Sequence, residues 1–103
     1  MRLRWTFGAR DDLAAIASYI SEDNEAAARR WVSRLRTQAA RATRFPRSGR
    51  MVPELGRRDV RELLLRGYRI VYVVREEEVL VLTVFEGHRE LRVTEAELPD
   101  VEG

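Results

Sequence analysis

Three short apolar runs, separated by turn-like breaks, dominate the second half of the chain. They are Glu62–Leu65, Ile70–Val74 and Val79–Phe85. The second and third runs are rich in β-branched and aromatic side chains, and each has the length of a strand rather than a helix. The breaks contain a glycine that tolerates positive φ, Gly67, and a charged cluster that must face water, Arg75–Glu78. The pattern therefore predicts an antiparallel meander of three strands between Val60 and Arg92.

The first residues alternate apolar side chains with arginines and a threonine. This is the period of a half-buried strand, which we predict over Arg2–Phe7 and expect to join the same sheet as the meander. Thr6 is placed to cap a following helix, because its hydroxyl can accept from an orphan backbone N–H. The apolar stripe of that helix has the 3.6-residue period and consists of Ala9, Leu13, Ile16, Ala17 and Ile20.

A second helix is predicted from about Glu25 to Thr43, after a polar stretch, Ser21-Glu22-Asp23-Asn24, that breaks the first helix and caps the second. Its stripe is narrow and mostly small: Ala28, Trp31, Leu35, Ala39 and Ala42. Small residues allow close approach, so we expect the two helices to form an antiparallel hairpin on one face of the sheet. Trp31 is interpreted as a core anchor, with base stacking as the alternative. Phe45-Pro46 ends the helix, and a short extended piece follows at Met51–Leu55.

Length and composition favour one α+β domain over residues 1–103, with an acidic tail, 93–103, that is expected to fray. There are no cysteines and a single histidine, so we expect neither disulfides nor a multi-histidine metal site, and no cofactor. No apolar run reaches the roughly 20 residues that span a bilayer, and the start of the chain, MRLRWTF, lacks the long apolar segment of a signal peptide. A cytoplasmic protein is expected.

Charge is distributed unevenly, although the net charge is only +2. Eight arginines and no acidic residue lie between Ala26 and Pro53, and every one of the 19 basic residues is arginine. The absence of lysine is explained by genomic base composition. The clustering indicates an acidic partner, either nucleic acid or an acidic polypeptide segment. Salt bridges to the acidic tail of the same chain are the alternative.

An ordered set of landmarks runs through the chain. Early members are Trp5-Thr6-Phe7, Ala9, Asp12-Leu13, Ile16 and Tyr19-Ile20; later ones are Pro46, Gly49, Arg50, Pro53, Glu54, Arg61, Glu62, Leu63, Tyr68, Arg69, Ile70, Tyr72 and His88-Arg89. No single motif is distinctive, but the set as a whole resembles the ParE branch of the RelE/ParE superfamily of type II toxin–antitoxin toxins. The resemblance extends from Arg2 to Arg92.

The resemblance implies a fold with an N-terminal strand, a helical hairpin and an antiparallel sheet. It implies a ParD-like antitoxin whose C-terminal segment wraps the toxin. The implied target is DNA gyrase for ParE-type toxins, or ribosome-bound mRNA for RelE-type endoribonucleases. Our hypothesis is that acidic side chains of the antitoxin meet the arginines of the second helix, Arg29, Arg30, Arg34 and Arg36, along the hairpin and a sheet edge. We expect no tight binding of nucleic acid by the chain alone.

The nuclease alternative rests on a small set of residues, Arg61, Arg69, His88 and Arg89. The arginines would stabilise charge on a scissile phosphate, and His88 is the only side chain with an ordinary pKa near neutrality. The nucleases typically carry a tyrosine or a further base after the last strand and several use lysines, and this chain has neither. The sequence therefore favours a non-catalytic gyrase inhibitor over a ribonuclease.

Purely structural roles are predicted for the same positions. Arg61 and Arg69 are expected to pair with Glu62, Glu54 or Glu86, because a half-buried arginine needs an acceptor. Arg50 and Glu54 are expected to form an ion pair that closes the turn at Pro53. Tyr68 and Tyr72 share one face of their strand, and at least one is expected to pack against the helices.

Overall fold

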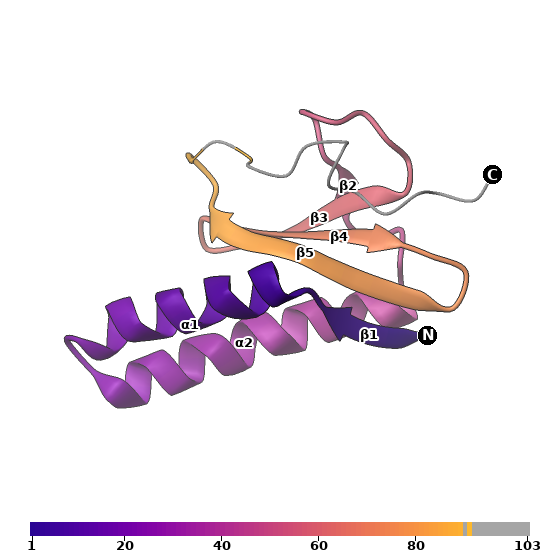
Figure 1. Ribbon diagram of the computed structural model, residues 1–103. Coiled ribbons are helices and arrows are strands. Elements are labelled where there is room, and N and C mark those ends of the chain that lie inside the picture. Colours follow the sequence, from indigo (N-terminus) through magenta and orange to yellow (C-terminus); the bar gives the residue numbers. More distant parts are fainter. Residues whose placement is uncertain (90, 92–103) are drawn as a thin grey trace.

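The helices and strands follow one another in the predicted order. Over residues 1–89 and 91, which the computed structural model describes, they are β1 (Arg2–Trp5), α1 (Phe7–Ser21), α2 (Glu25–Arg44), β2 (Arg50–Met51), β3 (Val60–Leu65), β4 (Tyr68–Val74) and β5 (Glu78–Glu86) (Figure 1). The α+β class, the helical hairpin and the three-stranded meander are confirmed. The acidic tail expected at 93–103 lies outside the described residues.

The strands form one sheet in the order β1-β5-β4-β3-β2. The meander is antiparallel throughout, with Ile70 opposite both Leu63 and Val84. As expected, β1 joins this sheet, but it lies parallel to β5, with Leu3 opposite Val79. The sheet is therefore mixed. Parallel neighbours cannot be joined by a tight turn, and here the helical hairpin and the first strands of the meander lie between β1 and β5 in the chain.

Both helices pack on one face of the sheet, as predicted, and lie side by side beneath it in Figure 1. The core on this face combines Ala9, Leu13, Leu35, Ala39 and Ala42 of the helices with Ile70, Tyr72, Val79, Val81 and Val84 of the strands. Tyr68 is partly buried against this core, so both tyrosines of β4 face the helices. Trp31 is a partly buried member of the same core, with its ring 5.8 Å from that of Tyr68 in an edge-on arrangement.

The opposite face carries a second apolar cluster. It consists of Val52, Val60, Val71, Val73, Leu80 and Leu82, with Leu55, Phe85 and Leu91 packed at its margin. Leu82 is an extra residue in β5, because Thr83 pairs with Val71 while Val81 pairs with Tyr72. This β-bulge lets Val81 and Val84 both face the helices although they are three positions apart.

Two predicted boundaries need correction. Phe7 is not the last strand residue but the first residue of α1, and it is 82% exposed. The cause is Thr6, whose hydroxyl oxygen accepts from the N–H of Ala9 at 3.0 Å and donates to the carbonyl of Leu82 at 3.1 Å, which starts the helix there. The extended piece expected at Met51–Leu55 is displaced, since β2 covers Arg50–Met51 and a turn follows.

Candidate functional site

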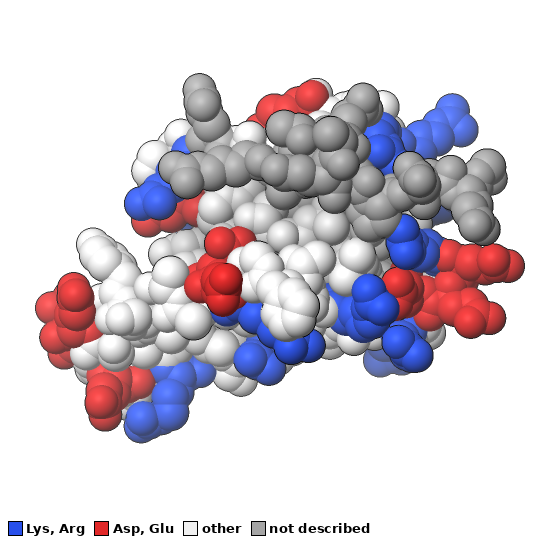
Figure 2. Space-filling model, in the orientation of Figure 1, with Lys and Arg blue, Asp and Glu red and all other residues white. Residues whose placement is uncertain are grey.

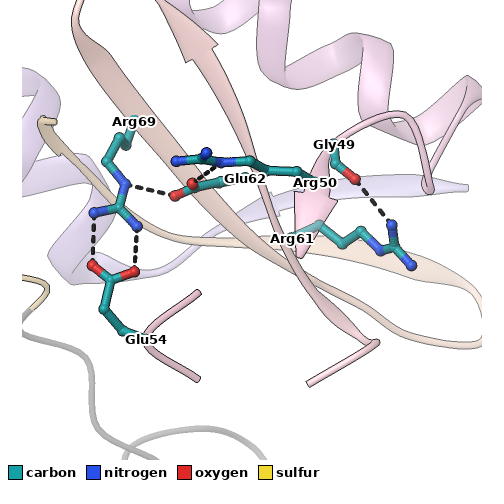
Figure 3. Close-up of polar contacts among 6 residues, drawn as sticks. All are labelled: Gly49, Arg50, Glu54, Arg61, Glu62 and Arg69. Atoms are coloured by element: carbon teal, nitrogen blue, oxygen red, sulfur yellow. Dashed lines mark hydrogen bonds and ion pairs between the residues drawn. The ribbon is translucent and has the colours of Figure 1, made fainter. Parts of the chain in front are cut away.

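The arginine at the centre of the landmark residues, Arg69, is buried on the face of the sheet away from the helices. Its two terminal nitrogens donate to the two carboxylate oxygens of Glu54 at 2.7 and 2.8 Å, and its Nε donates to Glu62 at 2.6 Å (Figure 3). The guanidinium carbon also lies 4.9 Å from the centre of the Phe85 ring. Bidentate pairing and stacking are the contacts to which a planar guanidinium is best suited. The expected pairing of Arg69 with Glu54 and Glu62 is confirmed.

Glu62 is the most deeply buried carboxylate of this group, with 1% of its surface exposed. One oxygen accepts from Nε of Arg69 and the other accepts from Nε of Arg50, so that a single carboxylate lies between two guanidinium groups (Figure 3). A buried charge is tolerated only when it is paired and hydrogen-bonded, and both oxygens of Glu62 meet that condition.

Two predicted ion pairs are wrong. Arg50 does not pair with Glu54, because the register of β2 places Arg50 directly opposite Glu62. Arg61 does not bind a carboxylate; it donates to the carbonyl oxygens of Gly49 at 3.1 Å and Arg58 at 3.0 Å. Neighbouring residues of a strand point to opposite faces, so Arg61 points away from the face on which Glu62 and Glu54 bind Arg69.

Tyr72 connects the segment between α2 and β2 to the sheet through hydrogen bonds. Its buried hydroxyl donates to the carbonyl of Pro46 at 2.7 Å and accepts from the N–H of Gly49 at 3.2 Å. Burial raises the pKa of Tyr72 above its ordinary value. A side chain at residue 49 would collide with this arrangement, since a Cβ there would lie 2.5 Å from the Tyr72 hydroxyl and 2.6 Å from the carbonyl oxygen of Glu62. The sequence marked these positions as landmarks but gave no sign that they contact one another.

Glu54 links this network to the stability of the fold at low pH. Hydrogen bonds from Arg69 hold the pKa of Glu54 at about 2, below its ordinary value of 4.5. Because the pKa is lowered in the folded state, the stabilising contribution of Glu54 is fully present above about pH 4.5 and is lost as the pH falls through about 2.

We expect Glu54→Gln to reduce the free energy of unfolding at pH 6, and we expect the difference from the parent protein to shrink steadily below pH 4.5. Urea unfolding followed by circular dichroism over this pH range measures both values. Glu76→Gln is the control, because Glu76 is exposed and makes no ion pair with any described residue. A constant difference between the Glu54→Gln variant and the parent protein across the range would contradict the assignment.

The residues of the nuclease alternative are not brought to one place. Arg61 lies opposite Tyr72, which faces the helices, whereas Arg69 lies opposite Phe85 on the other face of the sheet. His88 is on the surface after β5, and its Nε2 lies 3.0 Å from an oxygen of Glu86. Arg89 is exposed and lines a groove beside α1. The two arginines of the nuclease alternative therefore lie on opposite faces of the sheet.

The groove beside α1 has a volume of about 490 Å³ and lies against the part of β5 that extends beyond β1. Asp12 closes its inner wall, since one carboxylate oxygen accepts from the hydroxyl of Thr83 at 2.7 Å and from the N–H of Val84 at 3.0 Å. Tyr19, which is 71% exposed, and Tyr68 supply aromatic surface on its other walls.

The helical hairpin carries a second groove and most of the clustered arginines. The groove between α1 and α2 has a volume of about 640 Å³, and small residues such as Ala17, Ser18 and Ala28 line it together with Arg29 and Arg36. All four arginines predicted to meet an antitoxin (Arg29, Arg30, Arg34, Arg36) are exposed. Basic side chains recur along the lower margin of the molecule in Figure 2, the side on which Figure 1 places α2.

Comparisons with known proteins decide the family. The family described as "ParE toxin of type II toxin-antitoxin system, parDE" matches residues 3–91, which is most of the chain. This chain belongs to the ParE toxin family. A relative from Sinorhizobium fredii, described as "Putative toxin Y4kP", is 37% identical over 92 residues, with 86% of this chain and 91% of the relative covered.

A solved structure supports the same assignment for this ParE-family chain. The structure is described as "Chromosomal ParDE TA system from P. aeruginosa", and its TM-score is 0.70 at 25% identity, with 84% of this chain and 95% of that chain covered. The match to ParE extends from β1 to just beyond β5, so the charged network, Tyr72 and the helical hairpin all lie within it.

Residues 1–89 and 91 of this ParE-family chain meet the requirements of neither a metal site nor a membrane-spanning helix. In that part of the chain, no group of three or more histidine, cysteine, aspartate or glutamate side chains is arranged to hold a metal ion. Neither α1 nor α2, the helices described there, is both long and apolar enough to cross a membrane.

Proposed function

We propose that this chain is a non-catalytic toxin that inhibits DNA gyrase and is neutralised by a ParD-like antitoxin. The observation that carries the proposal is the ParE match across residues 3–91. The geometry of the nuclease candidates supports the choice of mechanism. Cutting RNA needs a base, an acid and cations gathered around one phosphate. Here Arg69 is buried and paired with two carboxylates, and Arg61 points to the opposite face and donates to two carbonyls.

The proposal predicts the outcome of two assays on the purified chain. We expect inhibition of gyrase supercoiling with accumulation of cleavage complexes, and no codon-positioned cuts in toeprints of translating ribosomes. His88→Ala tests the nuclease alternative without disturbing the core, because His88 is exposed. We expect this variant to stay toxic. Ribosome-dependent mRNA cleavage that His88→Ala abolishes would overturn the proposal in favour of a RelE-like endoribonuclease.

The antitoxin is proposed to be an acidic, amphipathic segment that binds along the helical hairpin. Arg29 and Arg36 line the groove between α1 and α2, so carboxylates of a helix lying in that groove would reach both guanidinium groups. Arg30 and Arg34 lie on the adjoining exposed side of α2. Charges arranged in this way accelerate association more than they tighten binding, and the acceleration is screened by salt.

The antitoxin arm of the experiment adds the antitoxin to the gyrase assay and measures its rate of binding to the toxin. We expect replacement of Arg29, Arg30, Arg34 and Arg36 by glutamine to slow association about tenfold at low salt and much less at high salt. The control variant replaces Arg2, Arg10, Arg58 and Arg75 by glutamine, which removes the same charge from sites outside α2. Equal effects of the two variants would show that net charge, not the arginine face, matters.

A further inference from the structure

The arginines of α2 fall into two rows, and the arginines of one row do not line the groove between the helices. Positions 30, 34, 37, 41 and 44 recur at alternate spacings of four and three residues, so they form one stripe along the helix. Four of the five are arginine (Arg30, Arg34, Arg41, Arg44), and the fifth is Thr37. We call the four arginines the outer row. Arg29 and Arg36 belong to a separate row beside α1.

The outer row is exposed, and no acidic residue lies between its members in the sequence. All four arginines are exposed, and no carboxylate of the described residues lies within ion-pair distance of any of them. The nearest acidic residue of α2 itself is Glu25, at the other end of the helix from Arg44. The row therefore presents one sign of charge on a rigid scaffold.

The chemistry of this face fits a phosphate backbone better than a protein surface. No residue of α2 is among the exposed large hydrophobic side chains of the described chain, and the position that interrupts the row is Thr37. The centres of protein interfaces are apolar and rich in aromatic residues, whereas interfaces with DNA are polar and strongly positive. From Arg30 to Arg44 the row is about 21 Å long at 1.5 Å per residue, the length of about six base pairs.

We propose that the outer row of α2 binds the phosphate backbone of duplex DNA without regard to sequence. Guanidinium groups suit this task, since each can donate two hydrogen bonds to one phosphate. Binding of this kind has a dissociation constant of about 10⁻⁴ to 10⁻⁶ M at physiological salt, which agrees with the expectation that the chain alone does not bind nucleic acid tightly. Arg30 and Arg34 are shared with the proposed antitoxin surface, so antitoxin and DNA compete for this face.

The test uses the purified chain and a labelled duplex of about 20 base pairs, with fluorescence anisotropy measured from about 0.05 to 0.2 M salt. Four phosphates neutralised give a slope of about −3.6 in a plot of log affinity against log salt concentration, at about 0.9 per phosphate. Replacing the outer row by glutamine is expected to bring the slope close to zero and to weaken binding at least tenfold at the low-salt end. The control variant at Arg2, Arg10, Arg58 and Arg75 is expected to keep most of the slope.

Three outcomes of the salt titration would overturn the inference. They are an absence of binding by the parent chain, a slope that survives removal of the outer row, and equal losses in the two variants. A polyglutamate peptide of matched charge is the competing probe, and tighter binding of this peptide than of the duplex would identify the row as a protein surface instead. Circular dichroism confirms that both variants fold. Because the assay contains no gyrase, its result is independent of the proposed gyrase inhibition.

Discussion

Gly49→Ala is expected to destabilise the fold by about 3 kcal/mol, although the substitution adds only one methyl group. Overpacking of a tight site typically costs 1–3 kcal/mol. Here the added Cβ would lie 2.5 Å from the hydroxyl of Tyr72 and 2.6 Å from the backbone oxygen of Glu62, and the backbone of a paired strand cannot yield cheaply. Movement of residue 49 would also break the hydrogen bond between its N–H and Tyr72. At about 4–8 °C per kcal/mol, the melting temperature should fall by 12 °C or more.

Thermal unfolding of the Gly49→Ala variant and of a Gly8→Ala control measures this effect. A Cβ at Gly8 would meet its nearest atoms at 3.8 and 3.9 Å, which is ordinary contact, so the control should melt close to the parent protein. Adding Tyr72→Phe to Gly49→Ala removes one of the colliding atoms. The double variant should therefore lose less stability than the sum of the two single variants. A Gly49→Ala protein that melts within about 2 °C of the parent would refute the close packing of this connection.

Local chemistry and periodicity were sufficient to predict the elements of the fold. Thr6 and Asn24 cap the two helices, each with a side-chain oxygen 3.0 Å from a backbone N–H, and both are residue types that favour this position. The shared parity of Tyr68 and Tyr72 correctly indicated the face that the helices cover. These predictions succeeded because each depends only on residues a few positions apart in the same helix or strand.

Features that depend on pairing between distant segments were not predictable in the same way. The bulge at Leu82 lies within a run in which Thr83 is the one polar residue, and a single threonine in a strand does not mark a change of face. The parallel orientation of β1 depends on how the whole hairpin crosses the sheet. Phe7 continued the alternation of the first strand, but Thr6 caps α1 through the N–H of Ala9 and is held by the carbonyl of Leu82, so the strand ends at Trp5.

The candidate site shows the same division. The resemblance singled out the residues that build the charged network, but proximity in sequence suggested the wrong partner for Arg50. Glu54 is four residues from Arg50, whereas Glu62 is twelve residues away and becomes its neighbour only through the register of β2 and β3. A carboxylate partner is predicted for Arg61 because a half-buried arginine needs an acceptor, and the alternation of strand faces gives it two carbonyls instead.

Neutralising Glu62 should lower the free energy of unfolding more than neutralising any other carboxylate in the described part of the chain. Glu62→Gln is expected to cost about 3–5 kcal/mol, the usual cost of breaking a buried ion pair by removing one partner. An amide offers one acceptor where two guanidinium groups need one each, and its NH₂ group would face a donor. Arg50 can turn to solvent, because its side chain is 56% exposed, and the amide oxygen can then accept from Nε of Arg69. The side chain of Arg69 is only 8% exposed, so it would still lose one of its two carboxylate partners where water cannot replace the charge.

Urea unfolding of the Glu62→Gln and Glu86→Gln variants separates this effect from the loss of a surface charge. Glu86 pairs with His88, whose side chain is 82% exposed, and pairs of this kind are worth about 0–1 kcal/mol. A second comparison replaces both partners, Glu62→Leu with Arg69→Met. Exchanging a buried ion pair for apolar side chains of similar volume is often neutral, so this double variant should be more stable than Glu62→Gln alone. Equal costs for Glu62→Gln and Glu86→Gln would mean that the network contributes no more than an exposed pair, and that Arg69 finds other acceptors when Glu62 is lost.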